Sequence, residues 1–207
     1  MARKKDVAPA LWAHDQSFEM SAVLCGIDEV GRCPLAGNVV AACVILDLSL
    51  PPITGLNDSK KLSPEMREAL FPIILQQALA WGIGEATPEE IDRLNILNAT
   101  FLAMRRALDS LPKRPAFLLV DGNQTIPGVS IPQKTLVGGD GVSASIAAAS
   151  VLAKVTRDRS MMAWDQKFPE YGFASHKGYG TAEHREALGQ HGVSPIHRRS
   201  FCSAFLT

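Results

Sequence analysis

The sequence has too few cysteines, at the wrong spacings, for a disulfide framework or a zinc site. Its 207 residues include four cysteines, none in a C-x-x-C pair, and no cysteine–histidine cluster has zinc-ligand spacing. Three of the four lie in or beside apolar strand-like segments, where a reduced, buried thiol is expected. This pattern favours a reducing compartment, and we expect a cytoplasmic protein. The cysteines are Cys25, Cys33, Cys43 and Cys202.

Long apolar segments and an excess of one charge are also lacking. No apolar run approaches the roughly 20 residues that a membrane span needs. The first twenty residues hold a short apolar stretch interrupted by Pro9, without a convincing signal-peptide cleavage site, so we expect a flexible N-terminal arm over 1–20. The formal net charge is zero, which excludes binding to nucleic acid by bulk charge but permits a local basic patch.

Internal repeats, low-complexity tracts and a G-x-x-x-x-G-K-[ST] phosphate loop are absent from the sequence. Hydrophobic residues make up 46% and charged residues 20%, an ordinary globular composition. The length suits one domain with a full core, which we assign to 21–207. Because no apolar stripe is left over for a subunit interface, we expect a monomer.

What is present is an alternation of strands and helices. Proline caps mark two helix starts, at Ser63-Pro64 and at Thr87-Pro88, and Pro132 places the last strand at a sheet edge or at its own beginning. The order predicts an α/β fold with a mixed central sheet of about five strands, flanked by helices, and a helical C-terminal region. Strands are predicted at 22–30, 38–46, 80–87, 116–122 and 130–140, and further helices at 95–111, 143–168 and 182–190.

Three aspartates share a position in this pattern. Asp28, Asp121 and Asp140 each end an apolar strand, and Glu29 follows the first of them. Strand ends are where ligand sites gather in such sheets, and oxygen-only donors suit Mg²⁺ or Mn²⁺. Neighbouring strand residues point to opposite faces, so the strand must end or bulge near Glu29, or that residue must offer its backbone carbonyl. Because aspartate before glycine is also a common turn pair, a solvated-turn interpretation stays open for these acids.

Five blocks of sequence, taken in order, resemble bacterial ribonuclease HII, a type 2 RNase H. Each block alone is weak, but together and at these spacings they are highly specific, and they span 22–205. The blocks are GIDEVGRCPLAGNVVAACVIL, LNDSKKLSP, LLVDGN, GGDGVSASIAAASVLAKVTRDR and YGFASHKGYGT.

The resemblance implies an RNase H-like fold and an endonuclease that hydrolyses the RNA strand of RNA–DNA hybrids. It also implies incision on the 5′ side of a single ribonucleotide embedded in duplex DNA, leaving a 3′-hydroxyl and a 5′-phosphate. Two ions of Mg²⁺ or Mn²⁺ are expected with substrate bound. The catalytic and metal-binding acids of the family correspond to Asp28, Glu29, Asp121 and Asp140.

The resemblance also implies how substrate is bound. The ribose-sensing turn of the family corresponds to Gly31, Arg32 and Cys33, and its sugar-stacking tyrosine to Tyr179. Backbone groups of a tight turn can reach the 2′-hydroxyl, which distinguishes RNA from DNA. Phosphate contacts are expected from Lys60, Lys61 and Lys177.

Two positions depart from the family pattern. The turn usually reads Gly-Arg-Gly, where this chain has Cys33, and Asn38 stands where proline is common. A Cβ at Cys33 could crowd the ribose, or strain the backbone if the position needs a positive φ. An alternative is therefore an RNase H-like nucleic-acid-binding module with weakened or altered junction selectivity. A third possibility is another Mg²⁺-dependent phosphoryl-transfer enzyme on a related scaffold.

The remaining charged residues are expected to have structural roles or to lie at the surface. Asp158 is expected to pair with Lys154 at helical spacing and not to bind metal. Four further histidines have no shared ligand spacing and are expected at the surface. They are His14, His184, His191 and His197.

Overall fold

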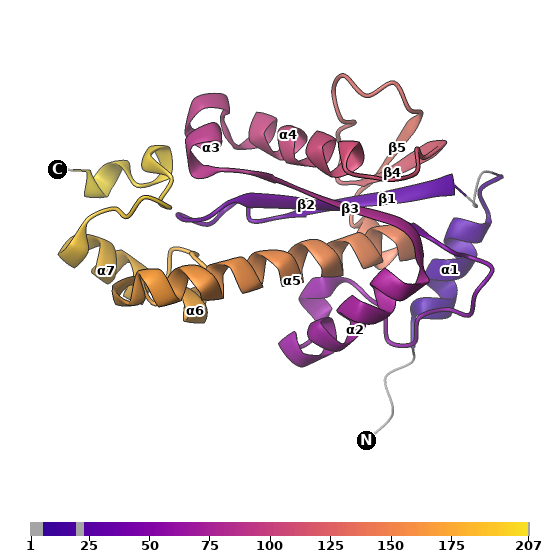
Figure 1. Cartoon of the computed structure of the whole chain (residues 1–207), viewed down its shortest axis with the longest axis horizontal. Helices are drawn as coiled ribbons and strands as arrows, with labels where there is room; N and C mark the ends of the chain where they lie inside the picture. Colours follow the sequence, from indigo (N-terminus) through magenta and orange to yellow (C-terminus); the bar gives the residue numbers. More distant parts are fainter. Residues whose placement is uncertain (1–5, 20–22, 207) are drawn as a thin grey trace.

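A computed structural model describes residues 6–19 and 23–206 of the chain. Within them, five strands form one sheet in the order β3-β2-β1-β4-β5 (Figure 1). The strands are β1 (Leu24–Val30), β2 (Val39–Leu46), β3 (Ala78–Ala86), β4 (Phe117–Asp121) and β5 (Gln133–Leu136). The predicted class, a mixed α/β sheet of five strands, is confirmed.

The sheet mixes two kinds of pairing. β1 pairs with β2 and β2 with β3 in antiparallel fashion, and a short glycine-bounded turn joins β1 and β2 as a hairpin. β4 lies parallel to β1 and β5 parallel to β4. Helical segments lie between β1 and β4 in the chain, whereas a loop over 122–132 without a helix joins β4 to β5. β5 is an edge strand, in agreement with Pro132 directly before it.

Helices cover both faces of the sheet (Figure 1). One face carries α3 (Pro88–Leu94) and α4 (Ile96–Asp109), and the other carries α1 (Ala8–Gln16), α2 (Pro64–Gln77) and α5 (Ala144–Lys167). α6 (Phe173–His176) and α7 (Ala182–His191) gather at the far end of α5, as the predicted helical C-terminal region. Among the described residues, no helix combines the length and apolarity that crossing a bilayer requires.

Burial on both faces of the sheet explains why the sequence of β2 is apolar at every position. Val40 and Val44 belong to the core under α5, whereas Val39 and Cys43 belong to the core under α4. A strand buried on both faces has no solvent side and therefore shows no polar alternation.

Small residues bring α5 close to the sheet. A Cβ added to Gly26 of β1 would lie 2.2 Å from the backbone carbon of Ser145. The alanines that follow Ser145 are fully buried, so the first turns of α5 pack directly on β1 and β2. This close approach fixes the start of α5, and the segment before it, against the end of β1.

The N-terminal segment differs from the flexible arm expected over 1–20. Residues 8–16 form α1, which buries Leu11 and Trp12 in the core against α5. The buried carboxylate of Asp15 accepts a hydrogen bond from the backbone N–H of Ser145 at 2.8 Å and so caps the start of α5. This prediction is wrong for α1, because the short apolar stretch is a docking face; residues 1–5 and 20 lie outside the described residues.

The capping prediction at Ser63 holds. Ser63 accepts a hydrogen bond from the N–H of Met66 at the start of α2, as its position before Pro64 indicates. Among the apolar residues of α2, Leu70 and Ile74 are buried, but Met66 and Ile73 are exposed. α2 lies at the margin of the sheet, so it buries a narrower stripe than its sequence suggests.

Candidate active site

The functional candidates meet where β1 and β4 separate. The two strands pair from Leu24 and Phe117 up to Ile27 and Val120, after which β1 continues paired with β2 alone. Asp28 and Glu29 follow directly on one strand and Asp121 ends the other, so carboxyls flank the point of separation. We call the four predicted acids the carboxylate rim. They are Asp28, Glu29, Asp121 and Asp140.

Asp28 and Glu29 reach the rim from the last residues of β1. The register with β2 runs unbroken from Gly26 to Val30, and Asp28 and Glu29 pair in turn with successive alanines of β2. Their side chains therefore start on opposite faces of β1. Of the possibilities raised by the sequence, a strand end near Glu29 agrees with the structure, because β1 ends at Val30 and no bulge interrupts its register.

Asp121 and Asp140 are brought to the rim by a short connection after β5. Asp121 accepts a hydrogen bond from the N–H of Gly139 at 2.7 Å, which ties the end of β4 to the start of α5. Asp140 lies in a short 3₁₀ helix, Gly139–Gly141, and not at the end of a strand as predicted, because β5 already ends at Leu136. The side chain is nonetheless buried next to the other acids.

Burial and mutual repulsion dominate the electrostatics of the rim. Burial raises the pKa of Asp28 well above its ordinary value, and Coulombic repulsion raises it further. The pKa of Glu29 is raised by burial too, although the Arg32 guanidinium, 3.6 Å away, partly offsets this. The carboxyls that repel Asp28 are Glu29, Asp121 and Asp140.

Asp58 is a further acid at the rim that sequence reasoning missed. Burial raises the pKa of Asp140, and neighbouring Asp58 raises it further. Asp58 also accepts a hydrogen bond from the N–H of Lys60 at 2.8 Å and caps the short helix Ser59–Lys61. The Nζ of Lys60 lies 3.5 Å from Oδ2 of Asp140. The sequence block LNDSKK could have indicated this acid, since an aspartate before two lysines can orient both.

The donor chemistry of the rim suits a hard divalent cation. Its side chains offer oxygen only, and a cation among them would relieve the repulsion that raises the pKa values of Asp28 and Asp140. Over residues 6–19 and 23–206, no three histidine, cysteine, aspartate or glutamate side chains are already arranged as a metal-ligating group. The acids would therefore have to move closer together to hold an ion.

The turn after β1 has a backbone fixed by a buried arginine. Gly31 has φ +93°, a conformation that favours glycine. Arg198, fully buried, donates five hydrogen bonds of 2.6–3.0 Å to carbonyls of the turn. The carbonyls belong to Gly31, Arg32, Pro34 and Gly37. Its burial lowers the pKa of Arg198 to about 9. Sequence analysis gave Arg198 no role, because nothing local reveals these distant partners.

The two departures from the family pattern are accommodated without strain. Cys33 is exposed, and in the described part of the chain the non-glycine residues with positive φ are Asn95 and Lys177. Cys33 therefore adopts a backbone conformation open to any residue. The side-chain amide of Asn38 donates a hydrogen bond to Glu85 on β3, which joins the turn to the sheet.

Tyr179 stands on a loop that two buried histidines support. Its side chain is 39% exposed, while its carbonyl lies 2.9 Å from Nδ1 of His184. Because a carbonyl only accepts, Nδ1 of His184 carries the proton and its Nε2 accepts from Nε2–H of His197, at 2.9 Å. Nδ1 of His197 then accepts from the N–H of Ser194. The expectation of surface histidines is wrong for this pair, which is buried and fully hydrogen-bonded.

The predicted basic residues divide into two groups. Lys60 and Lys61 are exposed beside the rim, with side chains 78% and 61% accessible. Lys177 lies on the loop before Tyr179 and directs its ammonium to the carbonyl of Ala174. Asp158 pairs with Lys154 at 2.7 Å, as expected for an ion-pair partner.

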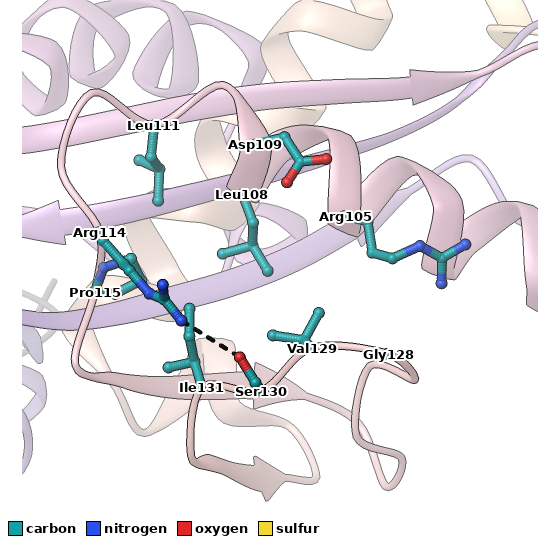
Figure 2. Close-up of a pocket in the computed structure, with 10 residues that line it drawn as sticks. All are labelled: Arg105, Leu108, Asp109, Leu111, Arg114, Pro115, Gly128, Val129, Ser130 and Ile131. Carbon is teal, nitrogen blue, oxygen red and sulfur yellow. Dashed lines mark hydrogen bonds between the residues drawn. The ribbon is translucent and has the colours of Figure 1, made fainter.

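One of the cavities beside the sheet adjoins the rim. A small cavity of about 70 Å³ is lined by Glu29, Arg32 and Asp121, among others. A larger cavity of about 500 Å³ lies beyond the end of α4, where Arg114 donates a hydrogen bond to Ser130 (Figure 2). No carboxylate of the rim lines this second cavity, so it is separate from the candidate site.

Comparison with known proteins gives a consistent result. The family model described as Ribonuclease HII matches residues 25–204. A ribonuclease HII of Syntrophotalea carbinolica is 55% identical over 200 residues, which cover 95% of this chain and 93% of that protein. One of Dechloromonas aromatica is 59% identical over 179 residues, covering 86% and 90%. The crystal structure of ribonuclease H2 from Pyrococcus horikoshii superposes with a TM-score of 0.73 at 27% identity, covering 88% of this chain and 96% of that one.

Proposed function

Because the chain belongs to the ribonuclease HII family, we propose that this ribonuclease incises duplex DNA on the 5′ side of a single embedded ribonucleotide, besides hydrolysing the RNA of RNA–DNA hybrids. Water adds to phosphorus as the P–O3′ bond breaks, so the products carry a 5′-phosphate and a 3′-hydroxyl. One observation carries the proposal. Acids from two parallel strands and from the segment before α5 gather where β1 loses β4 as a partner, and they repel one another there.

We propose that the carboxylate rim holds two Mg²⁺ or Mn²⁺ ions when substrate is bound, within a catalytic domain over 21–207. The chemistry of the donor set and the raised pKa values of Asp28 and Asp140 support this, since divalent cations relieve repulsion among buried carboxylates. When bound, the ions would supply activation of the attacking water and stabilisation of the leaving oxygen. Asp121, tied to Gly139, keeps the ends of β4 and α5 together while the acids bind.

The chain's own residues would position the nucleic acid. Lys60 and Lys61 extend, exposed, from the short helix capped by Asp58 and would contact phosphates beside the rim. Lys177 would contact a phosphate next to Tyr179. Contacts of this kind hold the duplex without reading its sequence, so affinity should fall with added salt.

The turn and Tyr179 would read the sugar. Backbone groups of Gly31, Arg32 and Cys33 can hydrogen-bond the 2′-hydroxyl, because the buried Arg198 fixes their orientation. The ring of Tyr179 would stack on the neighbouring deoxyribose, where a 2′-hydroxyl would crowd it. Reading one ribose and one deoxyribose together distinguishes a junction from a continuous RNA tract.

A second candidate function rests on Cys33. Its exposed side chain adds bulk where the family usually has glycine, so the protein could bind the junction with altered selectivity. The backbone of Cys33 is unstrained and its polar groups are unchanged, and these observations favour the enzyme over the binding module.

The test is incision of three duplexes with and without Mg²⁺. They contain a single ribonucleotide, an RNA tract, or DNA alone. We expect metal-dependent cutting of the first two, with cleavage 5′ to the single ribonucleotide, and none of the third. The Asp140→Asn protein should lose incision, whereas Asp109→Asn, a matched change on an exposed residue of α4, should retain it. Binding of the junction without incision would favour the binding module, and metal-independent cutting would contradict the proposed rim.

A further inference from the structure

The two segments proposed to read the sugar touch each other through their backbones. The N–H of Leu35, in the turn segment 31–38, donates to the carbonyl of Gly178 at 2.8 Å. A Cβ added to Gly178, which has φ +82°, would lie 2.7 Å from the carbonyl oxygen of Ala36. We call segments 31–38 and 177–180 together the turn–tyrosine region. Its two halves are far apart in sequence and packed at backbone distance.

A second buried arginine spans the two halves. Arg157 of α5 is 1% exposed and donates three hydrogen bonds to carbonyl oxygens. Nε binds Asn38 at 3.1 Å and Nη2 binds Ala36 at 3.1 Å, both in the turn segment. Nη1 binds Lys177 at 3.0 Å, in the tyrosine segment. Because the guanidinium is planar with donors in fixed directions, these bonds set the separation of the segments.

Arg157 also approaches the two groups proposed to contact sugar. A Cβ at Gly31 would lie 2.3 Å from its Nε, so the turn glycine packs directly on the guanidinium. The guanidinium carbon lies 5.8 Å from the ring centroid of Tyr179, within the range of a cation–π contact. In the described part of the chain Arg157 forms no ion pair, so neutral carbonyls hold its charge.

We propose that Arg157 is a positioning residue that fixes the distance between the Gly31–Cys33 turn and the Tyr179 ring, and thereby determines the preference for a single ribonucleotide over an RNA tract. The inference rests on the proposed function. Turn and tyrosine can read adjacent sugars only if they are held one nucleotide apart. When that spacing is free to vary, the two sugars are no longer read together, and the preference for a single ribonucleotide over an RNA tract is lost.

The experiment compares kcat/KM for the single-ribonucleotide duplex with kcat/KM for an RNA-tract hybrid, both with Mg²⁺. Arg157→Lys keeps the positive charge but cannot donate all three hydrogen bonds of the planar guanidinium. We expect this ratio to fall by about tenfold, which corresponds to the free energy of one lost charge-assisted hydrogen bond. Turnover on the RNA tract should stay within about threefold of the original protein. The control is Arg159→Lys on the same helix, whose exposed side chain pairs with Glu68 and should leave the ratio unchanged.

Each outcome of this experiment supports or overturns either the proposed function or the positioning role of Arg157. A wild-type protein that does not cut at the single ribonucleotide overturns the proposed function itself. A wild type that cuts there, with an Arg157→Lys protein that melts at a lower temperature but keeps the ratio, overturns the positioning role in favour of a structural one. If Arg157→Lys does not fold, Gly178→Ala takes its place, since its Cβ pushes against the carbonyl of Ala36 and changes the spacing of the two segments while residue 157 stays arginine. An unchanged ratio in Gly178→Ala overturns the proposal.

Discussion

The carboxylate rim and the turn–tyrosine region lie side by side but treat buried charge in opposite ways. In the rim, acids face other acids, and the pKa values of Asp28 and Asp140 are raised. In the turn–tyrosine region, Arg157 and Arg198 are buried among backbone carbonyls that satisfy their donors. The rim therefore keeps repulsion among its acids despite the nearby Lys60 and Arg32, which favours cation binding, whereas the donors of its neighbour are satisfied. Binding chemistry belongs to the first and geometric selection to the second.

The largest effect is expected from removing one acid of the rim. Asp28→Asn should lower incision about a thousandfold, because several kcal/mol of cation-mediated stabilisation of the transition state would be lost. In EDTA, the same variant should melt at a higher temperature than the original protein, since one repelling, desolvated carboxyl is gone. Incision kinetics check the loss of activity, and thermal melts in EDTA check the change in stability. A variant that is destabilised in EDTA would contradict the description of the rim as repulsive.

The opposite response is expected in the turn–tyrosine region. Arg198→Met leaves carbonyls of the turn without donors, which should cost about 3–5 kcal/mol of unfolding free energy and lower Tm by about 10 °C. Arg199→Met, next in the chain and exposed, is the matched control and should change Tm little. Equal melting temperatures for the two variants would mean that Arg198 does not hold the turn.

Acid should weaken the support of Tyr179 through the buried histidine pair. Burial lowers the pKa of His184, and burial with repulsion from His184 lowers that of His197 to about 4. A base whose folded pKa lies below its unfolded value contributes stability that is complete above pH ~6.5 and is lost as pH falls toward 4. Thermal melts from pH 7 to pH 4 should show this loss of stability. The fall in Tm with pH should be smaller in the His197→Asn protein, whereas the His191→Gln protein, changed at the exposed end of α7, should show the same fall as the original protein.

The smallest effect is expected at Cys33. Because the side chain is exposed and its backbone unstrained, Cys33→Gly should cost about 1 kcal/mol or less in stability. Incision at a single ribonucleotide should rise a few-fold if the thiol crowds the ribose, by about 1 kcal/mol of relieved contact. Unchanged kinetics on both single-ribonucleotide and RNA-tract substrates would show that the turn tolerates the side chain.

The sequence predicted what local patterns encode. The strands β1 and β2, the cap at Ser63 and the position of Asp121 at a strand end are signalled within a few residues of each feature. α1 was missed because its short apolar stretch becomes a helix face only when α5 is there to bury it. Two of the three partners of Arg157, and all those of Arg198, are more than a hundred residues away, so no local pattern could indicate the burial of these arginines. Asp140 was placed at a strand end because the edge strand β5 is short, and edge strands leave weak signals.

The most direct test of the account is whether the rim binds divalent cations as a unit. Thermal melts with Mn²⁺ or Mg²⁺ against EDTA should show a rise in Tm for the original protein, because an ion that binds only the folded state stabilises it. The Asp121→Asn protein should show little or no rise, and Asp109→Asn should behave like the original. An equal rise in all three, or none in the original protein with substrate duplex present, would contradict the claim that these four acids converge to hold metal.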